Sequence, residues 1–182
     1  MVARGDDFVN AAGGQRLIMR QTAADTGGEL LEMEAIHAPG GEPPPVHAHP
    51  QQEERFTALA GAMRVQVAGR EHRLAAGDVL VIPAGTPHTM WNDGEEEARF
   101  RWEVHPALGS ESFFACLYAL AGRDGRPPLL LFAALFRAYR DEFRVTGTVH
   151  RLLFGARGAL ARVRGADFRS ATQTSPQTRV AD

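Results

Sequence analysis

The chain has 182 residues, of which 44% are hydrophobic and 23% charged, and its net charge is −2 at pH 7. This length fits one domain with additions, and the composition excludes a wholly disordered chain. Cys116 is the only cysteine, which excludes an intramolecular disulfide and a thiolate zinc site and favours the reducing cytoplasm. No export signal is visible, and the longest apolar run, 129–136, is too short for a membrane span. We therefore predict a cytoplasmic protein.

Between residues 15 and 105, short alternating segments are separated by glycine, proline, asparagine and aspartate. This pattern predicts about eight strands in an antiparallel sandwich or barrel. Residues 31–37 alternate as a half-buried strand does, and Ala68 with Gly69 predicts a tight hairpin. In the last strand, 99–105, the alternation does not decide which face is inward. The first part of the chain is therefore mainly β.

After Pro106 the apolar spacing becomes helical. We predict a first helix with Ser110 as its N-cap, a second from Leu129 to about Phe143, and a third from Thr148 to Arg164. Three helices this hydrophobic need an apolar surface to cover.

The predicted organisation is therefore a β-barrel domain over residues 1–105 and a helical extension over residues 106–168 that packs on the barrel or on a partner subunit. Residues 169–182 have the polar composition of a disordered tail. The basic helical segment lacks an aromatic platform or reader motif, so we predict no nucleic-acid partner.

Four side chains suggest a metal site. His47 and His49 are separated by one residue, so both imidazoles leave the same face of an extended strand. Glu54 follows on the next predicted strand, and His88 follows a turn rich in proline and glycine. Three imidazole nitrogens and one carboxylate suit a divalent transition metal such as Fe, Mn, Ni, Cu, Co or Zn, with positions left for water or substrate.

These residues closely resemble the two sequence motifs of the cupin superfamily, written G-x5-H-x-H-x3,4-E-x6-G and G-x5-P-x-G-x2-H-x3-N. The ten matching positions are Gly41, His47, His49, Glu54, Gly61, Gly77, Pro83, Gly85, His88 and Asn92. Glu53 also fits the shorter spacing, but only Glu54 leaves six residues before Gly61, so we take Glu54 as the ligand and Glu53 as outward. The resemblance covers roughly residues 15–105. It implies a double-stranded β-helix, or jelly-roll barrel, that is often dimeric and holds the metal inside.

Five side chains are candidates for a substrate pocket beside the ion. They are Met33, His37, Phe56, Met90 and Trp102, and Phe100 has a similar position in the pattern. Plain filling of the barrel interior explains the apolar ones equally well.

Two kinds of function suit such a site. The first is an enzyme in which the ion binds an enolate, phenolate or carbonyl group and Glu54 can also act as a base. Cupins with similar motifs include dioxygenases that act on flavonols and related enols, while isomerases and decarboxylases use the same ligands. The second is a non-catalytic binding or sensing module that the ion stabilises. In both, a small molecule binds in the barrel, and the resemblance favours a homodimer.

Overall fold

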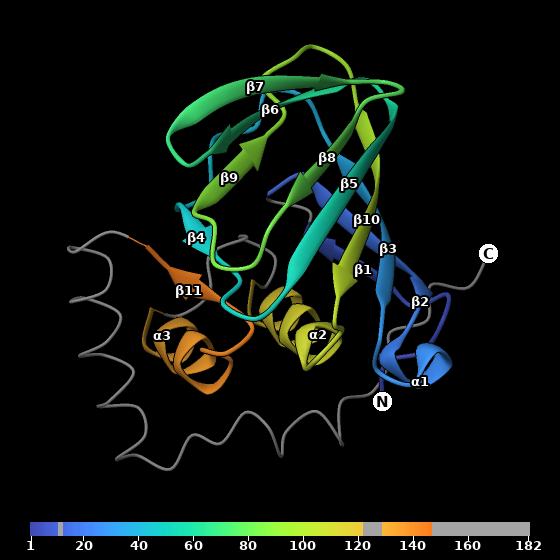
Figure 1. The fold of residues 1–182 in the computed structure, drawn as a ribbon, viewed down its shortest axis with the longest axis vertical. Coiled ribbons are helices and arrows are strands. Elements are labelled where there is room, and N and C mark those ends of the chain that lie inside the picture. Colours follow the sequence, from blue (N-terminus) through green and yellow to red (C-terminus); the bar gives the residue numbers. More distant parts are fainter. Residues whose placement is uncertain (11–12, 122–128, 147–182) are drawn as a thin grey trace.

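The computed structural model describes residues 1–10, 13–121 and 129–146, and these form two antiparallel sheets with helices at one end (Figure 1). The six-stranded sheet contains, in spatial order, β1 (Asp7–Asn10), β2 (Gln15–Gln21), β3 (Leu31–His37), β10 (Ala98–His105), β5 (Glu53–Ala60) and β8 (Val79–Ile82). The five-stranded sheet contains β11 (Arg144–Val145), β4 (His47–Ala48), β9 (His88–Trp91), β6 (Ala62–Val67) and β7 (Arg70–Ala75). The helices are α1 (Ala23–Thr26), α2 (Ser110–Ala121) and α3 (Leu129–Ala138).

Strand alternation places the apolar residues of β3 and β10 on the inner face of the six-stranded sheet. Phe100 pairs with Ala35 and Trp102 pairs with Met33, and Phe100, Ala35 and Met33 are all buried. The pairing therefore decides the inward face of β10, which the sequence left open. On the outer face, Glu34 forms ion pairs with arginines of β2 and β10.

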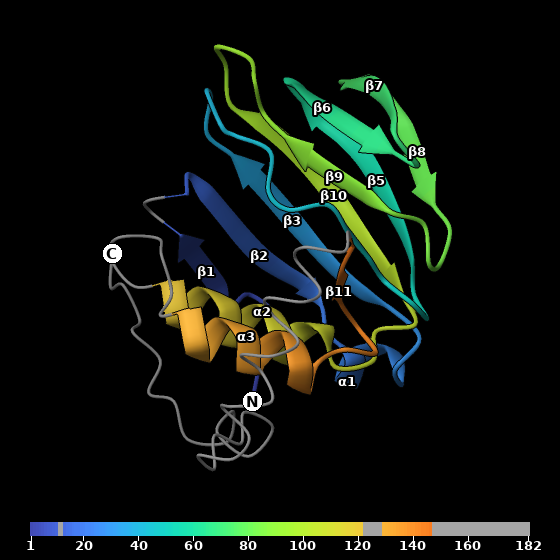
Figure 2. The same cartoon turned by 90° about the vertical axis from the view of Figure 1, so that its left-hand side faces the viewer.

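The inner face has two different partners along its length (Figure 2). At one end it packs on the five-stranded sheet through a core of Phe56, Ala58, Met63, Val65, Leu74, Ile82, Ala98 and Phe100. At the other end, where the sheets diverge, α2 and α3 pack against it through side chains that include Phe113, Phe114, Leu135 and Phe136. The first helices of the extension thus cover this chain's own sheet.

The carboxyl-terminal part departs from the prediction in two places. Ser110 does not act as a side-chain cap but is the first helical residue, and its hydroxyl group is hydrogen-bonded to the buried side chain of Gln52. Helix α3 ends at Ala138, well before Phe143, because the chain turns there and β11 pairs with β4. The predicted third helix and tail lie outside the described residues. Within the described residues, none of the helices has the length and apolarity to cross a membrane.

Two turns explain why specific small residues occur where they do. Gly61 joins β5 to β6 with a φ of 67°, and a Cβ there would lie 2.4 Å from the carbonyl oxygen of Glu97. Ala68 and Gly69 join β6 to β7 with φ values of 48° and 80°, as a type I′ hairpin turn requires. The first of these turns follows β5, which carries Glu54, and leads into β6, which pairs with β9.

Candidate metal centre

Three histidines from two neighbouring strands converge inside the barrel. His47 lies on β4 and His88 at the start of β9, directly opposite each other in the sheet, and His49 follows immediately after β4. The ring centroids of His47 and His88 are 4.5 Å apart. One ligand nitrogen from each of the three rings lies within 4.8 Å of the others. This spacing allows all three rings to reach one ion.

Backbone carbonyl groups fix the orientation of all three rings. The Nδ1 atom of His47 lies 3.1 Å from the Pro45 oxygen, that of His49 lies 2.7 Å from the Glu142 oxygen, and that of His88 lies 2.9 Å from the Thr86 oxygen. A carbonyl oxygen only accepts hydrogen bonds, so each Nδ1 must carry the proton. The Nε2 atom of each neutral ring is then left with a lone pair, which is the form that binds a metal ion.

Glu54 lies beside the histidines and is almost completely buried, with 1% of its surface exposed. Its Oε1 accepts a hydrogen bond of 3.0 Å from Trp102 Nε1, and its Oε2 lies 2.9 Å from His88 Nε2. His49 Nε2 is 3.3 Å from Oε1. Even so, neither His49 Nε2 nor Glu54 Oε2 has a hydrogen-bond partner with acceptable geometry. Buried polar atoms of this kind usually have a partner, and here the two belong to neighbouring residues of the histidine cluster and its adjacent carboxylate.

The electrostatics keep the donors close to the forms that a metal ion requires. Burial alone would raise the pKa of the Glu54 carboxyl, but the His49 and His88 rings outweigh it and hold that pKa at about 2. Burial, reinforced by His88 and His49, lowers the pKa of His47 to about 3, and burial also lowers the pKa of His49. Burial lowers the pKa of His88, but the contact with Glu54 outweighs burial, so the pKa of His88 is raised overall. A metal ion therefore meets a carboxylate and two neutral rings, and it competes with a proton at His88.

The residues present fit a divalent transition metal. Three oriented imidazoles, each of which offers an Nε2 lone pair in its neutral form, are donors that iron, manganese, nickel, copper, cobalt and zinc all accept. The three histidines can hold the ion, and Glu54 is adjacent to two of them. The motif residue directly after β9, Asn92, is buried and instead donates hydrogen bonds to the His37 and Glu96 carbonyl groups, a structural role in the turn.

A largely apolar cavity of about 180 Å³ adjoins the histidines. Of the five predicted pocket residues, His37, Phe56, Met90 and Trp102 line it, whereas Met33 does not and is fully buried in the core beneath the helices. The other lining residues are Gln15, Leu17, Ala35, Pro44, Pro45, His47, Glu54, His88, Phe100, Phe113, Phe114, Leu117, Tyr118, Phe132, Phe136, Phe143 and Val145.

The helical part of this lining was missed by sequence reasoning, which assigned those side chains only to helix packing. The available signal was the aromatic spacing, because Phe132 and Phe136 are four residues apart and therefore share one face of a helix. The extension thus supplies eight of the 21 residues that line the cavity, as well as covering the sheet.

The segment after α3 contacts the histidines directly. The ring of Phe143 stacks on His47 at 4.3 Å between centroids and meets the edge of His49 at 5.3 Å. β11 pairs Val145 with His47, and the Glu142 carbonyl group accepts the hydrogen bond from His49. The candidate metal centre is therefore built partly from residues more than 90 positions further along the chain.

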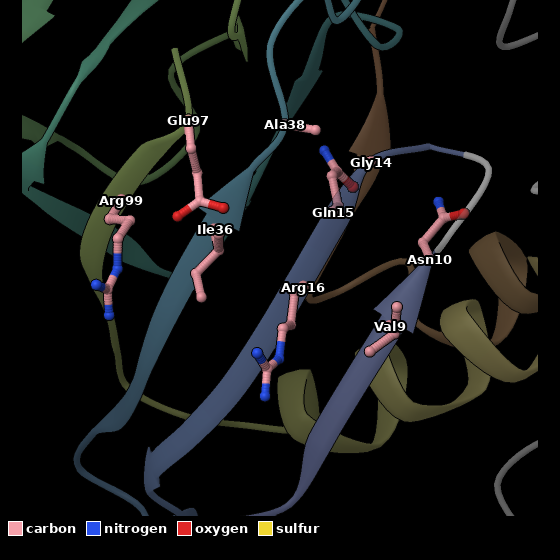
Figure 3. Close-up of a pocket in the computed structure, with 9 residues that line it drawn as sticks. All are labelled: Val9, Asn10, Gly14, Gln15, Arg16, Ile36, Ala38, Glu97 and Arg99. Carbon is pink, nitrogen blue, oxygen red and sulfur yellow. The ribbon is translucent and has the colours of Figure 1, made fainter.

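A second hollow, larger and more open, lies on β1, β2, β3 and β10, on the outer side of the six-stranded sheet (Figure 3). Its volume is about 370 Å³, and the side chains that line it include Val9, Ile36 and Arg99. Arg99 is paired with Glu34. Histidine is absent from the described residues that line this hollow, so it offers nothing comparable to the three-histidine cluster.

The fold and the three-histidine cluster define a β-barrel protein with a candidate metal centre in its interior. Residues 33–104 match the family model described as "Cupin domain". Residues 33–104 are therefore a cupin domain.

Sequence relatives cover only part of this chain. It is 34% identical over 62 residues to quercetin 2,3-dioxygenase from Bacillus subtilis, a match that covers 34% of this chain and 18% of the relative. It is 36% identical over 111 residues to germin-like protein subfamily T member 2 from Arabidopsis thaliana, which covers 58% of this chain and 47% of the relative. The chain thus spans less than half the length of the curated relatives it matches.

Two solved structures illustrate the shared fold. A predicted oxalate decarboxylase from Thermotoga maritima is 21% identical with a TM-score of 0.50, over 58% of this chain and 99% of that one. An RmlC-like cupin from Shewanella frigidimarina is also 21% identical with a TM-score of 0.50, over 59% of this chain and 89% of that one. At this level of identity the likeness concerns the fold alone.

Proposed function

We propose that this chain is a metal-dependent cupin that binds one divalent transition metal ion through His47, His49 and His88, with Glu54 as the fourth ligand. The observation that carries the proposal is the common orientation of the three rings, each with Nδ1 bonded to a carbonyl oxygen and Nε2 left for the ion. A histidine cluster with a purely packing role has no need for three rings fixed in the same tautomer.

The activity we propose is that of a dioxygenase acting on a flavonol or another enol-type small molecule. A bound transition metal would supply Lewis-acid or redox chemistry. The chain's own residues would bind the apolar part of the substrate in the adjoining cavity and exclude water from it. Glu54, a buried carboxylate beside the histidines, would accept the enol proton when its bond to the ion is released. The partial similarity to quercetin 2,3-dioxygenase supports this reaction class.

The first test is metal content and oxygen uptake. Protein prepared without added metal is analysed for its elements, loaded with each candidate ion, and assayed with flavonols and simple enols. We expect His88→Ala to lose metal and turnover together, and Glu54→Gln to lose turnover. Glu53→Gln is the matched control, because Glu53 is the neighbouring and partly exposed carboxylate. Turnover that survives in Glu54→Gln would contradict the role given to this residue.

A non-catalytic metal-stabilised binding or sensing module is the second candidate. It is favoured by the contact of Phe143 and β11 with the histidines, because an ion would then fasten the extension to the barrel. Tight metal binding and a melting temperature that falls on chelation, without oxygen uptake on any enol, would support this reading. Substrate conversion without oxygen would instead point to an isomerase or decarboxylase.

We also propose that the chain acts as a homodimer in the cytoplasm. The outer face near the edge strand β8 exposes three large apolar side chains, with Leu59 50%, Val79 55% and Val81 38% exposed. Such a surface suits a second copy of the chain. Light scattering should give a dimeric mass for the wild type and a monomeric mass for Val79→Asp. A monomeric wild type would contradict the proposal.

A further inference from the structure

The cavity beside the histidines has aromatic walls from two different parts of the chain. Trp102, on the barrel side, stacks on Phe56 at 5.3 Å between centroids and meets the edge of Phe114 from α2 at 4.9 Å. On the helical side, Phe113 and Phe136 contact Phe143. All of these rings line the cavity. Facing aromatic walls favour a flat ring between them, in stacked or edge-to-face contact.

The charges of the lining restrict the ligand further. Among the described residues that line the cavity there is no lysine or arginine. The one carboxylate is Glu54, beside the candidate ion, and the other polar side chains away from the ion are Gln15, His37 and Tyr118. Burial lowers the pKa of His37 to about 4 and raises the pKa of Tyr118, so both are neutral at neutral pH. A phosphate or carboxylate remote from the ion would find no cation to pair with.

The size of the cavity sets the third limit. Its volume is about 180 Å³. An engineered apolar cavity of roughly 150 Å³ is known to hold one benzene molecule. The present cavity therefore takes one ring with small substituents, whereas a three-ring flavonol requires the helices to move outward.

We propose that this cavity binds a small uncharged phenol or cyclic enol of about one ring, with its oxygen towards the three histidines and its ring between Trp102 and the phenylalanines of the helical extension. This inference rests on the proposed function, because it takes the histidine cluster as the metal site. It narrows the proposed substrates to the single-ring enols and phenols.

The experiment uses direct binding to the full chain, so it does not depend on turnover. The chain has two tryptophans, so Trp91→Phe leaves Trp102 in the cavity wall as the sole fluorescent reporter. Catechol, phenyl phosphate and quercetin are titrated into metal-loaded and metal-free protein. We expect catechol to quench Trp102 and to bind at least about tenfold more tightly than either of the others. In metal-free protein we expect catechol to bind more weakly but with the same order of preference, because the aromatic walls remain.

A filled cavity provides the second arm. Leu117→Trp places a large side chain in the lining from α2, and Leu120→Trp makes the same change on the same helix at a position outside the lining. Catechol binding, measured here by calorimetry because both variants add a tryptophan, should be lost in the first variant and kept in the second, with metal affinity unchanged in both. Binding that survives Leu117→Trp, or quercetin or phenyl phosphate binding as tightly as catechol, would overturn the inference. Failure to bind metal would instead overturn the proposed function, and the metal-free titration would still test the cavity.

Discussion

The contact between Phe143 and the histidines makes metal affinity depend on the helical extension. Phe143 stacks on His47 with an angle of 16° between ring planes and meets the edge of His49. On its other side it contacts Phe113 and Phe136 of the two helices. Removing the ring with Phe143→Ala therefore frees two of the three proposed ligands from the packing that orients them, while the hydrogen bonds to backbone carbonyl groups remain.

The size of the effect follows from these contacts. Groups that orient metal-bound histidines typically change metal affinity by about 10- to 100-fold when they are removed. Phe143→Ala should therefore weaken metal binding by at least about tenfold, which corresponds to about 1.4 kcal/mol. Because the ring is partly buried, the metal-free protein should also lose about 3 kcal/mol in its free energy of unfolding.

The matched control is Phe8→Ala. Phe8 is also partly buried against the same core, but its ring contacts Tyr118 and, among the described residues, no histidine ring. It should lower stability by a similar amount and leave metal affinity within about threefold of the wild type. The assays are calorimetric titration of metal-free protein with Ni²⁺ or Co²⁺ and melting with and without the ion.

Melting gives a direct criterion for this reasoning. At a fixed excess of ion, a tenfold weaker affinity reduces the metal-induced stabilisation by about 1.4 kcal/mol, or roughly 3–5 °C for a chain of this size. The reduction is expected in Phe143→Ala and not in Phe8→Ala. If the ion raises the melting temperature equally in wild type and Phe143→Ala, the ring has no part in holding the ligands.

Three further predictions concern stability. The pKa of His37 is about 4 in the folded protein, against an ordinary value of 6.5, so the unfolded chain binds a proton at this position first as the pH falls. The wild type should therefore lose stability between about pH 6.5 and 4. Between pH 7 and pH 4.5, the free energy of unfolding measured with denaturant should fall by about 2 kcal/mol less in His37→Gln than in the wild type. Gly61→Ala should lower the free energy of unfolding by more than about 2 kcal/mol, because its Cβ would clash with the Glu97 carbonyl oxygen. Gly69→Ala is the control, because Gly69 has a similar φ but open space around the position of a Cβ, and it should lower the free energy of unfolding by only about 1 kcal/mol. Deletion of residues 107–182 should give a chain that aggregates, because it uncovers the inner face beneath α2 and α3; a soluble monomeric truncation that melts at the wild-type temperature would contradict this.

The sequence was most informative where local geometry determines the structure. The one-residue spacing of His47 and His49 fixes a shared strand face, and turn glycines such as Gly61 occupy positive φ angles that few other residues adopt. The Ala68-Gly69 hairpin was predicted for the same reason. Each of these features depends on a few adjacent residues, so it can be predicted from the local sequence alone.

The parts of the site that the sequence did not reveal depend on distant contacts. The hydrogen bond from His49 to the Glu142 carbonyl group joins residues 93 positions apart, and nothing in the local pattern around either one indicates it. The apolar spacing after Leu129 continued as if helical to Phe143, but pairing of β11 with β4 ends the helix earlier. Met33 and Trp102 face each other across two strands, yet only Trp102 lines the cavity, because α2 and α3 pack where Met33 lies.

These distant contacts give the extension and the ion a reciprocal relationship. If docking of Phe143 and β11 raises metal affinity by a given factor, the bound ion must stabilise that docking by the same free energy. The hydrogen bond from Thr146 N to the Val46 carbonyl oxygen lies beside His47 and reports on this docking. Its amide should therefore exchange with solvent about tenfold more slowly in the metal-loaded protein, given the affinity change expected for Phe143. The barrel amides of β6 and β7, which are remote from the extension, provide the internal reference; equal slowing at both places would mean that the ion stabilises the whole fold rather than this contact.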